Sequence, residues 1–164
     1  MKRLLILRHA KSSWSDPELD DHDRPLNPRG RRDAPRIGRL VQAKEIAPDV
    51  IFCSTALRAR ATAALAVEAG NLTAGLHPTD DLYLAGPRIY IDLLMQLPSD
   101  HESAMVIGHN PGLEELLEEL TGNHHRLPTA ALAHVHLPID RWRDLATLAV
   151  AHLADLWRPK ELTD

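Results

Sequence analysis

Two histidines that follow short apolar runs are the residues of this chain best placed to do chemistry. Arg8 and His9 come directly after the run 4–7, and His109 follows the run 104–108. Two buried parallel strands that each end in a histidine would bring both imidazoles to one edge of a sheet, where open α/β folds bind their ligands. An arginine beside the first histidine favours an anion, and phosphate is the one that we expect. The sequence therefore predicts an enzyme that works on phosphoryl groups.

The elements that must position these residues alternate between strand-like and helix-like patterns. Apolar runs predict strands over 3–8, 49–53, 74–78, 104–108, 132–137 and within 145–153. Caps and helical spacing predict helices over 28–44, 55–69, 88–97 and 111–120. The first would begin at Asn27-Pro28 and be kinked near Pro35. This order predicts an α/β fold of three layers, with a mainly parallel sheet and helices on both faces.

The composition limits the class of protein. The 164 residues suit one domain, and 44% hydrophobic and 26% charged residues are ordinary values for a globular protein. A net charge of -4 argues against a broad nucleic-acid surface. The run 4–7 is too short for a signal peptide or a membrane span, and the single cysteine suits a reducing compartment. We expect one domain over residues 1–164 in the cytoplasm, with no nucleic acid or membrane as a partner.

Several ordered motifs carry a family resemblance. The segments 7–14, 24–30, 53–62 and 108–112 together resemble the histidine phosphatase superfamily, the phosphoglycerate-mutase-like group. The Arg-His-Ala-Lys-Ser-Ser-Trp form of the first motif, the short chain and Pro-Thr-Ala-Ala at 128–131 are similar to the SixA-type phosphohistidine phosphatases. The resemblance implies a single histidine phosphatase domain with a phosphoglycerate-mutase-like fold.

The resemblance also implies roles for individual residues. His9 would be the nucleophile that becomes transiently phosphorylated, while Arg8, Arg58 and His109 would hold the phosphoryl oxygens. Such a reaction needs an unprotonated imidazole in line with the leaving atom and positive donors around the oxygens. We expect no metal and no other cofactor, because the arginines supply the positive charge.

Four further positions are candidates for the site. Ser12 and Ser15 could line the pocket, and Ser15 stands where mutase relatives carry an asparagine that contacts phosphate. The backbone N–H of Asn110, at a helix start, is a candidate phosphate donor. Asp81 follows the weak third strand, where the wider superfamily carries a carboxylate that protonates the leaving group. A helix or turn cap is the alternative role for Asp81, and a basic phosphoramidate nitrogen could leave without a dedicated acid.

Other reactive residue types lack the spacing that their chemistry requires. Cys53 and Arg58 stand one residue too close for the loop of cysteine-dependent phosphatases, so we expect Cys53 in the core. His134 and His136, or the pair at 124–125, have no partner at zinc-site spacing. The chain also has no Gly-rich phosphate loop.

Two charged segments are expected to be solvated. The acidic stretch 16–23 lacks the glycine and terminal glutamate of a calcium loop. The arginines within 29–39 fit an exposed helix face, and a docking surface for an acidic protein is the alternative.

We therefore predict a phosphohistidine phosphatase that acts on a phosphorylated protein. Only about fifty residues separate Arg58 from His109, and so short a connection would leave the site open to a side chain presented by another protein. One alternative is the same chemistry on small phosphorylated substrates. Another is a binding module that holds phosphate without hydrolysing it. A monomer is expected.

Overall fold

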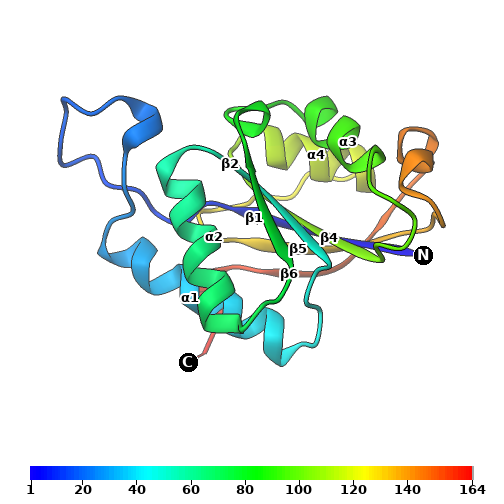
Figure 1. Ribbon diagram of the computed structural model, residues 1–164, viewed down its shortest axis with the longest axis horizontal. Coiled ribbons are helices and arrows are strands. Elements are labelled where there is room, and N and C mark those ends of the chain that lie inside the picture. Colours follow the sequence, from blue (N-terminus) through cyan, green and yellow to red (C-terminus); the bar gives the residue numbers. More distant parts are fainter. Residues whose placement is uncertain (164) are drawn as a thin grey trace.

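Six strands form one sheet in the computed structural model, which describes residues 1–163 (Figure 1). Their order across the sheet is β3-β2-β4-β1-β5-β6. β1 pairs in parallel with β4, and β2 pairs in parallel with β3 and β4, whereas β5 is antiparallel to β1 and β6. The predicted mainly parallel sheet is confirmed. The strands are β1 (Lys2–Arg8), β2 (Val50–Ser54), β3 (Gly75–Thr79), β4 (Ser103–Gly108), β5 (Leu132–Leu137) and β6 (His152–Trp157).

Helices cover both faces of this sheet, as predicted (Figure 1). The alternating side chains of β1 divide between two buried clusters, because successive residues of a strand point to opposite faces. Leu5 shares its cluster with residues of α1 and α2, and Leu4 shares the other with residues of α3 and α4. The helices are α1 (Pro28–Ala43), α2 (Leu57–Gly70), α3 (Pro87–Met95) and α4 (Gly112–Thr121).

Local signals explain where the helices begin and end. The Asn27 side chain accepts a hydrogen bond of 2.9 Å from the backbone N–H of Gly30 and so caps the start of α1. This helix continues through Pro35 to Ala43. At the end of α2, Asn71 adopts the left-handed conformation (φ 50°) of a C-cap.

The strand predicted within 145–153 is wrong for most of its length. Trp142–Thr147 forms a 3-10 helix, η3, and β6 begins only at His152. Trp142 is fully buried, its indole N–H donates to the carbonyl of His101 at 2.7 Å, and Leu145 joins the same apolar cluster as α3. Trp142 and Leu145 therefore reach the core from η3 and not from a strand. Among residues 1–163, no helix is long and apolar enough to cross a membrane.

Candidate active site

The pairing of β1 with β4 brings the two predicted histidines together. Arg8 lies opposite Gly108 in the parallel register, so His9 and His109 leave neighbouring strands at the same edge of the sheet. The backbone N–H of His9 continues the ladder with a 3.1 Å bond to the carbonyl of Gly108. The two imidazole centroids are 5.2 Å apart. The strand geometry, rather than a flexible loop, fixes this distance.

Both histidines line a cavity of about 200 Å³, here called the His9 cavity. Arg8 and Arg58 line it as well, so the sheet edge and the first turn of α2 bring all four principal candidates together. The cavity is also lined by Lys11, Ser12, Trp14, Arg24, Leu84, Asn110 and Thr129.

His9 is held in a neutral form that suits a nucleophile. Its side chain is buried, and Nδ1 lies 2.7 Å from the carbonyl oxygen of Ala10. A carbonyl oxygen only accepts, so Nδ1 carries the proton and Nε2 keeps its lone pair. Burial lowers the pKa of His9 to about 3, and the positive charges of Arg58 and Arg8 act in the same direction. His9 is therefore unprotonated at neutral pH.

His109 is neutral for the same principal reason. Burial first, and then the charge of Arg58, lower its pKa to about 4. Its Nδ1 lies 3.4 Å from Nη2 of Arg58, which can only donate, and its Nε2 lies 2.8 Å from Oγ of Ser54. Nε2 thus carries the proton and donates to Ser54. Ser54 is fully buried at the end of β2 and orients the second imidazole.

Arg58 is fixed by the acidic loop that the sequence suggested to be merely solvated. Its Nη1 donates to the backbone carbonyl of Asp21 at 2.7 Å, and its Nη2 donates to Oδ2 of the same residue at 3.0 Å. The Tyr83 hydroxyl donates to this carboxylate oxygen at 2.6 Å. The bond from Tyr83 lowers the pKa of Asp21 to about 2, with further help from Arg58. Asp21 therefore stays ionised and holds the guanidinium at the cavity.

Arg8 and Asn110 are tied to the loop that precedes β5. Nη1 of Arg8 and Nδ2 of Asn110 both donate to the carbonyl of Leu127, at 3.1 and 2.8 Å. Nε of Arg8 is buried and has no hydrogen-bond partner within residues 1–163. Burial lowers the pKa of Arg8, and the nearby charge of Arg58 lowers it further, whereas the carboxylate of Glu114 opposes the shift. A bound anion would satisfy these donors and relieve the repulsion between the two guanidinium groups.

Two of the predicted site residues do not line the cavity. Asp81 is exposed within the short 3-10 helix Asp80–Leu82, and its neighbour Asp80, which accepts a hydrogen bond from the hydroxyl of Thr55, does not line the cavity either. Ser15 is exposed, with its hydroxyl 2.8 Å from that of Ser13. In this loop Ser12 lines the cavity. The roles suggested for Asp81 and Ser15 remain predictions that the geometry does not support.

Sequence reasoning missed Ser54, Asp21 and Tyr83 as supporting residues. Ser54 directly follows the strand predicted over 49–53, just as His109 directly follows the strand predicted over 104–108, and this shared position was the available signal. Asp21 and Tyr83 carry no such signal, because they reach Arg58 through tertiary contacts between distant segments.

The reactive residues set aside above lie elsewhere. Cys53 is fully buried in β2, and burial raises the pKa of its thiol to about 11, so it remains a protonated core residue. His134 and His136 lie together on β5 with ring centroids 4.9 Å apart. Within residues 1–163, no group of three or more His, Cys, Asp or Glu side chains is arranged to hold a metal ion.

Comparisons with known proteins agree with this geometry. The family model of the histidine phosphatase superfamily (branch 1) matches residues 4–82. An uncharacterized chloroplastic protein of Arabidopsis thaliana is 32% identical over 157 residues, covering 90% of this chain and 72% of its own. The crystal structure of a SixA protein from Agrobacterium tumefaciens is 30% identical, with a TM-score of 0.83 over 96% of this chain and 98% of that one. The protein histidine phosphatase SixA complexed with tungstate, 21% identical, shares the fold with a TM-score of 0.85 over 98% and 99% of the two chains. The chain belongs to the histidine phosphatase superfamily, and its fold is that of the SixA proteins.

Proposed function

We propose that this protein is a phosphohistidine phosphatase that removes the phosphoryl group from a histidine of another protein. The observation that carries the proposal is the neutral, buried imidazole of His9 beside His109, Arg8 and Arg58 in one cavity. A lone pair on Nε2 is the nucleophile that phosphoryl transfer requires, and the guanidinium groups of Arg8 and Arg58 lie at the same cavity as donors for the oxygens.

In the first step, Nε2 of His9 attacks phosphorus while the bond from phosphorus to the substrate's imidazole nitrogen breaks. The leaving nitrogen keeps the bonding electron pair and is protonated, and the phosphoryl group is now on His9. Arg8 and Arg58 bind the oxygens by charge-assisted hydrogen bonds, and fixed donors of this kind contribute roughly 3–4 kcal/mol each toward a transition state. A bound phosphoryl group favours protonation of His109, whose Nδ1 would then donate to a third oxygen, and the backbone N–H of Asn110 is an additional donor.

In the second step, water attacks phosphorus, the bond to Nε2 of His9 breaks, and inorganic phosphate leaves. No carboxylate is assigned as the acid of the first step, since the leaving imidazole nitrogen is basic and Asp81 lies outside the cavity. The two arginines supply the positive environment, so the proposed reaction assigns no step to a metal ion.

Two exposed apolar side chains support a protein as the substrate. Trp14 and Leu84 line the His9 cavity, yet their exposed fractions are 72% and 58%. Apolar groups at the rim of an open cavity favour contact with another protein surface. A small phosphate ester would leave them in water.

The direct test compares a phosphohistidine protein with a panel of small phosphomonoesters at equal enzyme concentration. We expect kcat/KM to be highest for the phosphohistidine protein. Faster turnover of any ester would identify a phosphatase of small molecules instead. Stoichiometric binding of phosphate without release of inorganic phosphate from any substrate would identify a binding module.

A further inference from the structure

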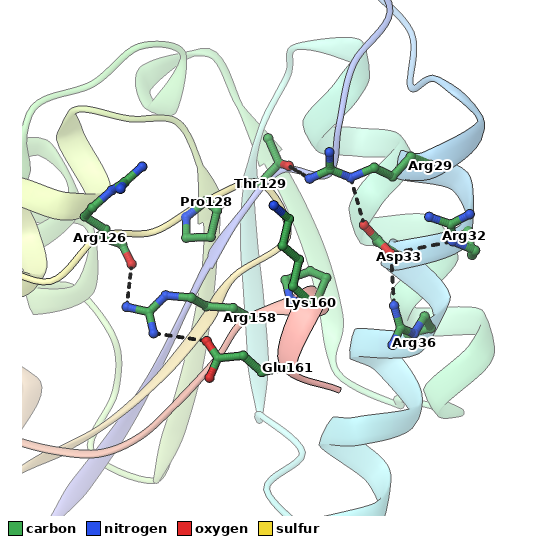
Figure 2. A pocket seen from close by; sticks show the side chains of 11 residues that line it. Arg29, Arg32, Asp33, Arg36, Arg126, Pro128, Thr129, Arg158, Lys160 and Glu161 are labelled. Atoms are coloured by element: carbon green, nitrogen blue, oxygen red, sulfur yellow. Dashed lines mark hydrogen bonds and ion pairs between the residues drawn. The ribbon is translucent and has the colours of Figure 1, made fainter. Parts of the chain in front are cut away.

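A second and larger cavity lies beside the His9 cavity and is strongly basic. Its volume is about 640 Å³, and its cationic side chains come from α1, the loop before β5 and the C-terminal segment after β6 (Figure 2). The lining holds two carboxylates, Asp33 and Glu161. Its six cationic side chains are Arg29, Arg32, Arg36, Arg126, Arg158 and Lys160. Together with the two carboxylates they give the lining a net charge of +4. A chain with a net charge of -4 thus concentrates positive charge here. We refer to this site as the basic cavity.

Internal contacts hold part of this charge in place without neutralising it. The buried carboxylate of Asp33 lies 3.6 Å from Arg29, 3.9 Å from Arg32 and 3.2 Å from Arg36, so one negative charge serves three guanidinium groups (Figure 2). Grouped cations repel one another, and an anion that enters the cavity relieves that repulsion.

Arg158 is anchored in a similar way, whereas two further cations have no such anchor within residues 1–163. The guanidinium of Arg158 donates to Glu161 at 3.2 Å and to the backbone carbonyl of Arg126 at 3.2 Å. Within residues 1–163, neither the guanidinium of Arg126 nor the ammonium of Lys160 has a hydrogen bond or an ion pair. Both groups are exposed at the cavity, so each can form an ion pair with a bound anion.

One short loop separates the basic cavity from the His9 cavity. Thr129 lines both, and its hydroxyl lies 3.5 Å from Nη2 of Arg29. The next residue, Ala130, donates its N–H to the carbonyls of Arg8 and His9, at 3.1 Å each. The basic cavity therefore has a fixed position relative to His9, and a ligand that fills one cavity can extend into the other.

We propose that the basic cavity is a second anion subsite, which receives carboxylate side chains that flank the phosphorylated residue of the substrate protein. The inference rests on the proposed function, because it needs a protein substrate. Charge complementarity selects acidic side chains, and the exposed Trp14 and Leu84 beside His9 favour a polypeptide over a small polyanion.

The experiment uses two phosphohistidine peptides of equal length, one with Asp and Glu flanking the phosphorylated residue and one with Ser and Gln. The measured quantity is the preference, the ratio of the two kcat/KM values. We expect the unaltered enzyme to prefer the acidic peptide. The double variant Arg126→Ala/Lys160→Ala should lower that preference about fivefold, since two exposed ion pairs each contribute a modest amount. Its matched control is Lys44→Ala/Arg143→Ala, which removes one exposed lysine and one exposed arginine outside the cavity and should keep the preference of the unaltered enzyme.

Each other outcome overturns the inference in a recognisable way. Equal turnover of both peptides would agree with the proposed function but would reject the anion subsite. An acidic preference that survives in Arg126→Ala/Lys160→Ala would place its source elsewhere. Binding of inorganic tripolyphosphate that this variant loses, without peptide discrimination, would assign the cavity to a small polyanion. Turnover of neither peptide, alongside hydrolysis of a small phosphoramidate, would instead reject the protein substrate itself.

Discussion

The carboxylate of Asp21 binds the guanidinium of Arg58 across 37 residues of chain, with Oδ2 3.0 Å from Nη2. Arg58 is almost fully buried at its side chain, whereas that of Asp21 is 43% exposed. The loop before α1 thus reaches over the site and holds one of its two guanidinium groups. This contact makes Asp21 a positioning residue whose loss should affect the reaction without removing a group that touches phosphate.

Replacement of Asp21 tests that role. We expect Asp21→Asn to lower kcat about tenfold with a smaller change in KM, because Arg58 loses its ionised partner and keeps only neutral acceptors. The control is Asp20→Asn, an exposed neighbour, which should behave like the unaltered protein. A KM effect with unchanged kcat would show that Asp21 acts on substrate binding instead.

The protonation of the two histidines provides a pH test. Burial holds the pKa of His9 near 3 and that of His109 near 4, well below the ordinary 6.5. In the unfolded chain both imidazoles take up protons near pH 6.5, so the folded state should lose stability as the pH falls from about 6.5 toward these values. Titration by ¹⁵N NMR should place both midpoints below pH 5. A midpoint near 6.5 for His9 would contradict the neutral nucleophile.

Ser54 should matter through the imidazole that it orients. Ser54→Ala removes the oxygen that accepts from Nε2 of His109, and we expect kcat to fall about three- to tenfold. The nitrogen shifts of His109 should show a changed tautomer balance. Ser103→Ala is the matched control, because Ser103 is also buried at a strand but its hydroxyl has no partner within residues 1–163. Equal effects of the two variants would reduce Ser54 to a structural residue.

Asp81 should be dispensable. Asp81→Asn is expected to keep full turnover of a phosphohistidine protein, since this exposed carboxylate does not line the His9 cavity and the leaving nitrogen is basic. A large loss of kcat, greatest above neutral pH, would restore Asp81 as the acid.

The core of the site was predictable because strand ends determine it. The apolar runs before His9 and His109 predicted two strands, and their parallel pairing alone brings the imidazoles together. Arg58 followed from the motif at the start of α2. The contacts of Asp21 and Tyr83 were not predictable, because a loop's course over the site depends on packing that leaves no periodic pattern. The same applies to η3, where buried Trp142 and Leu145 overrode the local pattern.

The central claim is that His9 carries the phosphoryl group between the two steps. The most direct measurement incubates the protein with a ³²P-labelled phosphohistidine donor, quenches it in alkali and maps the labelled residue. The account predicts an acid-labile, alkali-stable label on His9 that is absent in His9→Ala and present in Cys53→Ala. A label on any other residue, or hydrolysis by His9→Ala at the rate of the unaltered protein, would contradict it.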